Sequence, residues 1–253
     1  MSRRAHEVLC AVDTVAGYNT YIDLIAPLIA GKQIIRTAMT REVERVAAAI
    51  DTALQGRSCA LVSSGDPGIY AMAGLAFEMC RERKIRVMSP VRKNTHRDDN
   101  AGLTIEVVPG IPALSAGAAL LGAPLTHDFA AISLSDLLTP WETIARRIEA
   151  AAAADFVVVI YNPRSRRRTD QLVKAQQISM QHRDGRTPVG IVSRAFRDGQ
   201  DVRLVALQDL HTAEVDMQTT VFVGSSASFR YMDFMVTPRG YAGKYDMKMK
   251  NEK

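Results

Sequence analysis

The stretch FVVVIY at residues 156–161 is the clearest strand in the sequence, because it is continuous, apolar and rich in β-branched side chains. Runs of this kind are typical of strands buried on both faces of a sheet. Similar short apolar runs recur at residues 59–63, 105–108, 189–192 and 220–223. Stretches with helical periodicity lie between them, at residues 42–54, 70–83, 114–121, 141–152 and 169–181. This alternation predicts an α/β fold with largely parallel strand pairing.

The length of 253 residues suits one large domain or two compact ones. The stretch GAPLTHD at residues 122–128 follows a predicted helix and predicts a link between two halves. We therefore expect an N-terminal α/β domain over residues 1–125 and a C-terminal α/β domain over residues 126–253. Residues 90–100 are rich in charged side chains and predict a solvated loop, to which the sequence assigns no role.

The composition, with 47% hydrophobic and 23% charged residues, is that of a soluble globular protein. No apolar run is long enough to span a bilayer, and the basic N-terminus lacks the apolar stretch of a signal peptide, so a cytoplasmic location is expected. Cys10, Cys59 and Cys80 form no CxxC pair and are expected to be small buried residues. The dispersed histidines predict no metal site.

The formal net charge of +5 suits an anionic partner, either nucleic acid or a polycarboxylate. Plain surface solubility explains the same excess equally well. Aromatic residues make up only 6% and no basic-aromatic RNA-binding pattern is present, which weighs against an RNA-binding module.

The first candidate motif is SSGDPGIY at residues 63–70, which follows a predicted strand and precedes a helix. Ligands bind at this position in open α/β sheets. Its two glycines let the backbone approach a ligand, backbone N–H groups can hold a carboxylate, and Asp66 can accept from an ammonium group. The alternative is an ordinary turn, since Gly-Asp-Pro-Gly is strong turn chemistry.

The second motif is VPGIPALSAGAA at residues 108–119, where a strand runs into a loop and then a helix of small residues. Small side chains leave room for a flat ligand, although tight helix–sheet packing explains them as well.

The third motif is YNPRSRRR at residues 161–168, which begins at the carboxyl end of the strongest strand. Guanidinium groups suit carboxylates geometrically. The motif supplies four of them, Arg164, Arg166, Arg167 and Arg168. A solvated helix start is the alternative, but cations there oppose the helix dipole, which favours a functional role.

The fourth motif, GAPLTHDF at residues 122–129, contains the best candidates for proton transfer, His127 and Asp128. Histidine titrates near neutrality and therefore suits general acid–base work. A lone histidine in a connecting loop is more often structural or merely exposed.

Taken in order, these stretches resemble the tetrapyrrole (corrin/porphyrin) methylase family. Each match is weak alone, but the ordered set covers nearly the whole chain and is specific. The matching stretches are VAGYNTYIDL at 15–24, SGDPGIYAMA at 64–73, PGIPA at 109–113, AISLSDLL at 131–138, IYNPRS at 160–165, GIVSRA at 190–195 and MVTPRGY at 235–241.

The resemblance implies the two-domain tetrapyrrole-methylase fold of class III S-adenosylmethionine methyltransferases, with the active-site cleft between the α/β domains. It also implies a homodimer. Members open with a strand and a GxGPG loop. Here residues 4–12 resemble the helix that follows that loop, so the first strand and the loop are expected to be missing.

The resemblance also implies cofactor contacts, carried over by motif. Ser64, Gly65, Asp66 and Ile69 would line the methionine end of S-adenosyl-L-methionine, with Pro112 and Ala113 beside it. Asn162 and Ala195 would approach the adenosine, joined by one of Thr219 and Thr220.

Within the family, the pattern implies methylation of precorrin-3B at C17 with ring contraction to precorrin-4, on the pathway to cobalamin, leaving S-adenosyl-L-homocysteine. For the proton movements of ring contraction the candidates are His127 and Asp128, with Tyr161 in reserve. The four arginines of the third motif would bind the carboxylates of the substrate. The alternatives are another tetrapyrrole methylase, such as one that methylates precorrin-4 at C11, an RNA-binding module, or a non-catalytic tetrapyrrole-binding protein.

Overall fold

The computed structural model describes residues 1–90 and 102–247 and divides into two compact units, Met1–Pro112 and Ala113–Lys253. The predicted loop at residues 90–100 lies, apart from Pro90, outside the described residues. The units divide earlier than the expected boundary after residue 125, because helix α5 (Ala113–Leu121) packs on the sheet of the second unit through Gly117 and Leu121.

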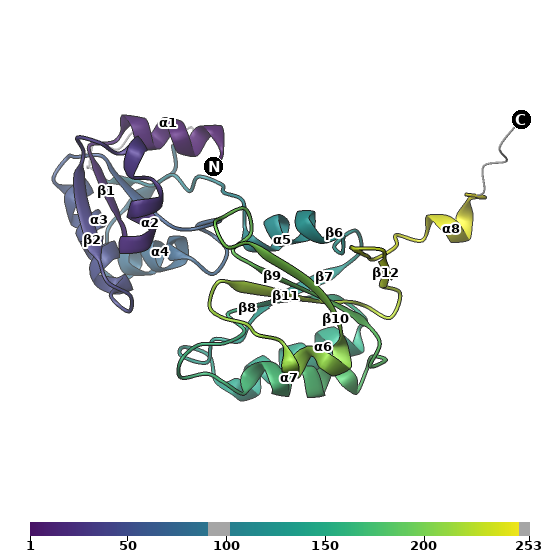
Figure 1. The fold of residues 1–253 in the computed structure, drawn as a ribbon. Helices are drawn as coiled ribbons and strands as arrows, with labels where there is room; N and C mark the ends of the chain where they lie inside the picture. The colour runs from purple at the N-terminus through teal and green to yellow at the C-terminus, as the bar shows by residue number, and fades with distance from the viewer. Residues whose placement is uncertain (91–101, 248–253) are drawn as a thin grey trace, which may run out of the picture. The chain divides into compact units, whose positions relative to one another are not determined.

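The first unit contains a parallel three-stranded sheet in the order β2-β1-β3, with bounds Gln33–Thr37, Thr14–Tyr18 and Cys59–Val62. One apolar cluster joins Val15 of the central strand to Leu9 of α1 (Arg3–Ala11) and Ile22 of α2 (Asn19–Leu24). A second cluster joins Leu61 of β3 to helices α3 (Glu42–Leu54) and α4 (Met72–Glu82). Figure 1 shows these elements in purple and blue.

The elements of the first unit agree with the sequence predictions at most positions. Helix α1 confirms the helix expected at residues 4–12, and α3 confirms the one at residues 42–54. The expected absence of an opening strand and GxGPG loop stays a prediction. The strand predicted at residues 105–108 is wrong, because pairing is confined to β4 (Val87–Met88) and β5 (Leu103–Thr104), and the last ladder bond runs from Ile105 N to Met88 O.

The second unit is built on a five-stranded sheet in the order β10-β9-β11-β8-β7. The strands are β7 (Phe129–Ser133), β8 (Val157–Tyr161), β9 (Pro188–Ser193), β10 (Asp201–Ala206) and β11 (Thr219–Val223). Within this sheet only β7 and β8 pair in parallel, so the prediction of largely parallel pairing is right for the sheet of the first unit and wrong for the main sheet of the second. The reason is connection length: β9 and β10 are joined by a short loop, which only antiparallel neighbours can use.

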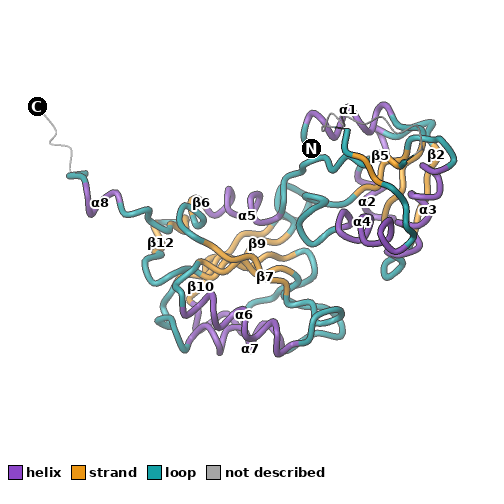
Figure 2. The backbone as a smooth tube through the Cα atoms, turned by 180° about the vertical axis from the view of Figure 1, so that it is seen from behind, coloured by secondary structure: helices purple, strands orange, loops and turns teal. Residues whose placement is uncertain are grey.

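Helices cover both faces of this sheet, as Figures 1 and 2 show. Helices α6 (Trp141–Ala153) and α7 (Gln171–Met180) and the 3-10 helix η2 (Leu207–Thr212) lie on one face, and α5 lies on the other. Strand β8 alternates between the two layers, since Val158 and Ile160 pack toward α6 and α7 whereas Val159 and Tyr161 pack toward α5. This burial on both faces explains why the FVVVIY run is continuously apolar.

The predicted link at residues 122–128 is part of the second unit. Its first residues form strand β6 (Gly122–Ala123), which pairs with β13 (Phe234–Val236), and β13 pairs with β12 (Phe229–Tyr231). Helix α8 (Tyr241–Lys244) follows. Within the described part of the chain, every helix is too short or too polar to cross a bilayer.

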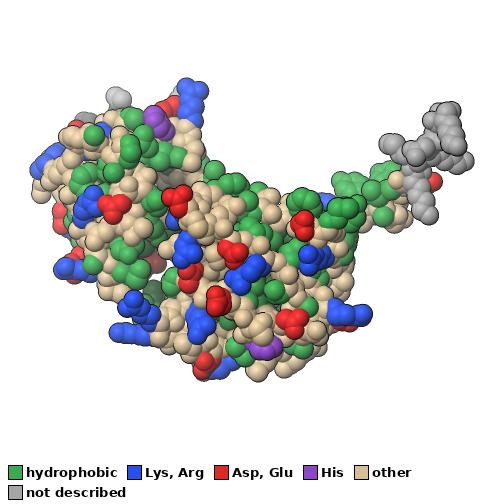
Figure 3. All heavy atoms as spheres, viewed as in Figure 1, with side chains coloured by type: hydrophobic (Ala, Val, Ile, Leu, Met, Phe, Trp, Pro, Cys, Tyr) green, Lys and Arg blue, Asp and Glu red, His purple; other side chains and the backbone are tan. Residues whose placement is uncertain are grey.

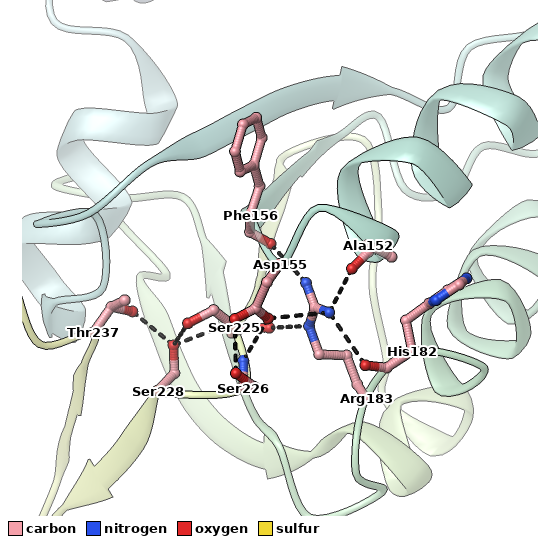
Figure 4. Close-up of polar contacts among 10 residues, drawn as sticks. Ala152, Asp155, Phe156, His182, Arg183, Ser225, Ser226, Ser228 and Thr237 are labelled. Carbon is pink, nitrogen blue, oxygen red and sulfur yellow. Dashed lines mark hydrogen bonds and ion pairs between the residues drawn. The ribbon is translucent and has the colours of Figure 1, made fainter.

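A buried arginine links several chain segments of the second unit near the start of β8 (Figure 4). Its guanidinium donates to four backbone carbonyls, those of Ala152, Phe156, His182 and Gly224. This residue, Arg183, also pairs with Asp155 at 3.2 Å, and Asp155 accepts from the backbone and hydroxyl of Ser226. Burial lowers the pKa of Arg183, and the charge of Asp155 opposes that shift. The cluster joins the ends of α6, α7 and β11, which is a structural role.

Candidate functional site

The first group of candidate residues lies at the carboxyl end of β3, where the chain turns sharply. Gly65 has the left-handed φ of +79°, which favours glycine. Both carboxylate oxygens of Asp66 accept backbone N–H groups, Oδ1 from Gly68 at 2.8 Å and Oδ2 from Gly110 at 2.9 Å. A Cβ at Gly110 would overlap the carbonyl oxygen of Gly65. The first two sequence motifs therefore meet backbone to backbone in the first unit.

Two features of this group could serve a ligand. The hydroxyl of Ser63 is buried and has no hydrogen-bond partner among the described residues, so it can serve a ligand. Gly65 and Gly110 approach each other through backbone atoms alone, and there is no room for a side chain at Gly110. The sequence motif includes Ser63 but does not single it out as a ligand-binding residue; its place directly after the strand was the available signal.

The second group lies at the carboxyl end of β8. Asn162 follows the strand with φ of +52° and donates from Nδ2 to the hydroxyl of Ser133, the last residue of β7, at 2.9 Å. Because β11 runs antiparallel to β8 and β9, its first residues lie beside their ends, with Thr219 opposite Ser193. Ala195 follows Ser193 closely along the chain. The structure thus gathers the predicted Asn162, Ala195, Thr219 and Thr220 at one edge of the sheet.

The two threonines differ in what they can offer to a ligand. The hydroxyl of Thr219 lies 2.8 Å from that of Ser193 and donates to Asp216 Oδ1 at 2.9 Å. Thr220 is adjacent and points to the opposite face, the one that carries Phe222 and α5. Of the alternatives that the sequence left open, Thr220 is therefore the better candidate.

Tyr161 connects this edge to the second motif. Its hydroxyl accepts the backbone N–H of Leu114 at 2.8 Å, in the first turn of α5, where helix N–H groups have no partner within the helix. The side chain therefore positions Ala113 and Leu114 next to the end of β8. Within the first unit, Gly110 N is bonded to Asp66, and within the second unit, Leu114 N is bonded to Tyr161.

Backbone strain marks the same turns. Positive φ values are rare outside glycine and cluster at functional sites. The first motif ends on Tyr70 with φ of +52°, and the turn after β9 contains Arg194 and Phe196 with φ of +50° and +56°. Sequence reasoning did not select Arg194 or Phe196, although the matched stretch GIVSRA at residues 190–195 pointed to this turn.

The proton-transfer candidates are not brought together. His127 and Asp128 directly precede β7, at the edge where β7 and β8 begin, and Asp128 O accepts from Val157 N. Tyr161 lies at the other end of the same strands. A five-residue strand spans about 17 Å, so His127 and Tyr161 stand at opposite edges of the sheet. Within the second unit, only Tyr161 shares an edge with the predicted cofactor residues.

The four arginines also separate into two kinds. Arg164, Arg166 and Arg167 are exposed beyond the end of β8. Arg168 is buried, with its side chain 7% exposed, 3.8 Å from Asp136 and 3.4 Å from the sulfur of Met217. Burial lowers its pKa, Asp136 opposes that shift, and its Nε has no partner among the described residues. Arg168 therefore differs from the solvent-facing cation that its motif predicts.

Cysteines and histidines form no metal centre in the described residues, where no group of three or more potential ligands exists. The expectation that all three cysteines are buried is wrong for Cys10, which is exposed on α1. Only Cys80 is fully buried, and Cys59 is half-buried in β3. A short amphipathic helix exposes part of its surface whatever the residue type.

Comparison with known proteins adds to this geometry. Residues 1–211 match the family of Tetrapyrrole (Corrin/Porphyrin) Methylases. The chain belongs to this family. A tetrapyrrole methylase of Salmonella typhimurium, the "Probable cobalt-factor III C(17)-methyltransferase", is 44% identical over 95% of this chain and 93% of its own length. The protein of the same name from Methanocaldococcus jannaschii is 39% identical over 96% of this chain and 93% of its own length.

A longer relative is the "Cobalt-factor III methyltransferase" of Priestia megaterium, which is 48% identical over 98% of this chain. The chain spans 44% of that protein's length. Among solved tetrapyrrole methylases, the methyltransferase CobJ aligns with a TM-score of 0.81 and 32% identity, covering 94% of this chain and 93% of its own. Cobalt precorrin-4 methyltransferase CbiF shares the fold at 18% identity, with a TM-score of 0.67 and 88% of each chain covered.

Proposed function

We propose that this tetrapyrrole methylase transfers a methyl group from S-adenosylmethionine to C17 of precorrin-3B or its cobalt-containing counterpart, with ring contraction. The observation that carries the proposal is the 44% identity to the Salmonella typhimurium protein, because that match extends over nearly all of both chains. The product of the cobalt-free reaction is precorrin-4. A C11 methylase acting on the next intermediate is the closest rival.

We propose that each of the two groups of strand-end residues contributes contacts to S-adenosylmethionine, as the family resemblance implies. Ser63, Ser64, Gly65 and Ile69, with the backbone from Gly110 to Pro112, hold its methionine end. Asn162, Ala195 and Thr220 hold its adenosine. When bound, the cofactor supplies a methyl group on a sulfonium. The protein contributes alignment and exclusion of water, which together account for several kcal/mol of barrier lowering.

The ring contraction needs a proton to leave a hydroxyl while a carbon–carbon bond migrates. Tyr161 is the candidate that shares an edge with the cofactor residues, and its hydroxyl is fixed by Leu114 N. His127 and Asp128 remain candidates that mutation can test. If Tyr161 moves the proton, His127→Ala keeps full turnover, while Tyr161→Phe lowers turnover and leaves the Kd of S-adenosylhomocysteine unchanged; full turnover in Tyr161→Phe would exclude it.

We propose a homodimer, as the family resemblance implies. Large apolar side chains are exposed along the C-terminal segment of the second unit, where Figure 3 shows them in green. They are Phe229, Tyr231, Met232, Phe234, Tyr241, Tyr245 and Met247. Exposed apolar surface of this kind marks interaction sites. Sedimentation equilibrium of the whole chain and of a Phe234→Glu, Tyr241→Glu variant tests this surface, and an unchanged monomeric mass in both would contradict it.

The main experiment consists of two reactions. Both contain the protein and S-adenosylmethionine with a labelled methyl group; one contains precorrin-3B and the other its cobalt form. We expect a product heavier by one methyl group, with the label on C17 by NMR. Label on C11 would support the rival methylase. No transfer to either macrocycle would contradict the proposal.

A matched pair of variants tests the cofactor group. Gly110→Ala places a methyl group where Gly65 O stands, so we expect no measurable binding of S-adenosylhomocysteine by calorimetry. Gly74→Ala, on α4 in the same unit, meets no atom within 4 Å and should bind normally. Equal affinities in the two variants would place the cofactor elsewhere.

A further inference from the structure

The carboxylate of Asp66 connects two separate loops of the first unit. We infer that Asp66 is a positioning residue, whose role is to hold the backbone of Gly110 against the turn at Gly65. The inference rests on the proposed function for its effect on cofactor affinity. The positioning role itself does not depend on the proposed function, because it concerns the order of the second loop, residues 105–112, in the ligand-free protein.

The second loop has little else to hold it. Residues 105–112 belong to no helix or strand, so their backbone is not anchored by a regular ladder of hydrogen bonds. Among the described residues, Ile105 N donates to Met88 O where the loop begins, and three further contacts tie the loop to the rest of the unit. Arg4 bonds to Glu106, the Ser2 hydroxyl donates to Pro109 O at 2.9 Å, and Gly110 N donates to Asp66 Oδ2.

Of these contacts, only the one from Asp66 reaches the residues nearest the first motif. Its other oxygen is held by Gly68 N at 2.8 Å, which fixes the carboxylate relative to the first turn. Two N–H donors on one carboxylate form charge-assisted hydrogen bonds, which are shorter and stronger than neutral ones. These bonds hold the backbone of Gly110 so close to that of Gly65 that a Cβ at residue 110 would not fit.

The substitution Asp66→Asn separates positioning from direct contact. Asparagine has the same shape but one acceptor oxygen, so its amide group must face one of the two backbone N–H donors and that bond is lost. We expect the Gly110 amide of the ligand-free variant to exchange with solvent about tenfold faster, as for loss of one net hydrogen bond. We also expect the Kd of S-adenosylhomocysteine to rise about tenfold.

The control is Asp13→Asn, in the same unit. Asp13 also accepts a backbone N–H, that of Ser58, but it lies where β1 begins, at the opposite edge of the sheet. This variant should leave both the Gly110 exchange rate and the Kd unchanged. Thermal unfolding of both variants shows that each is folded before exchange is measured.

A deaminated analogue of S-adenosylhomocysteine decides between the two roles. If Asp66 positions the loop, Asp66→Asn weakens binding of the deaminated analogue and binding of S-adenosylhomocysteine by the same factor. If Asp66 binds the ammonium group, the variant weakens binding of S-adenosylhomocysteine alone, and the inference is overturned. Unchanged Gly110 exchange overturns it as well. If the wild-type protein binds neither compound, the proposed function fails, while the exchange measurement still tests the positioning role.

Discussion

The three thiols differ in exposure and should therefore differ in reactivity, which depends on the thiolate. Burial raises the pKa of Cys59 to about 11, outweighing a hydrogen bond from the backbone of Ala16, and burial also raises the pKa of Cys80. Cys10 is exposed. At pH 8 we expect iodoacetamide to label Cys10 at least about tenfold faster than Cys59. Peptide mass spectrometry over a time course measures the rates, and equal labelling would contradict the assigned exposures.

Asp155 should make the stability of the second unit depend on pH. Burial disfavours its charged form, but hydrogen bonds from Ser226 and the charge of Arg183 outweigh burial, so its pKa lies below the ordinary 3.8. A depressed folded-state pKa gives stability that is present above 3.8 and is lost as the pH falls through the lower folded value.

The variant Asp155→Asn tests this dependence. It should be less stable than the wild type at pH 7, and the difference in unfolding free energy should shrink in acid below 3.8. Urea titrations at several pH values measure that difference. The exposed Asp209→Asn serves as control. A wild-type advantage that stays constant down to pH 2 would show that Asp155 is not held in its charged form.

At the scale of elements, the packing of α5 on the sheet depends on small residues. A Cβ at Gly117 would stand 2.7 Å from the ring of Phe222, in the middle of the buried face. Overpacking of this kind costs about 1–3 kcal/mol, while alanine gains up to about 1 kcal/mol over glycine in a helix.

We therefore expect Gly117→Ala to destabilise the second unit in urea unfolding. Gly74→Ala has open space and the same gain in helix propensity, so it should be neutral or stabilising. If both variants gain stability, the sheet tolerates α5 at a greater distance than the structure shows. A loss of stability would support close packing as the role of Gly117 in the second motif, for which the sequence allowed either a ligand or close packing.

At the scale of the whole molecule, the net charge of +5 does not gather into one basic patch on the face that Figure 3 shows. On the view in Figure 3, acidic and basic side chains are interspersed over the second unit. Several of its arginines pair with aspartates, as Arg186 does with Asp184 and Arg194 with Asp216. This mixture weakens the RNA-binding alternative, since nucleic-acid-binding proteins cluster their cations.

The exposed arginines beyond β8 should instead act on the substrate. We expect the triple variant of Arg164, Arg166 and Arg167 to alanine to raise the KM for the tetrapyrrole about tenfold with kcat unchanged, the pattern of uniform binding. Arg168→Ala, at a buried position, should mainly lower stability. A gel shift with RNA at moderate salt should be absent for wild type and triple variant alike. An unchanged KM in the triple variant would show that these arginines do not contribute to substrate binding.

Local sequence pattern by itself determined most of the helices and strands. The period of the apolar residues predicted α3 and α6 nearly to the residue and predicted β8 from one run, because each buries a regular face. Motif order also predicted the family, which the match over residues 1–211 confirms. These features depend on short-range chemistry, and the sequence displays short-range chemistry directly.

Only the tertiary structure decided features that depend on pairing over long separations. The sequence did not reveal that β11 enters antiparallel between β8 and β9, nor that α5 belongs with the second unit. It did not show that both oxygens of Asp66 serve backbone donors, one of them 44 residues away, or that His127 and Tyr161 lie at opposite edges. Hydrogen-bond partners and strand order are set by which surfaces meet in three dimensions, and residue identity alone leaves several such arrangements open.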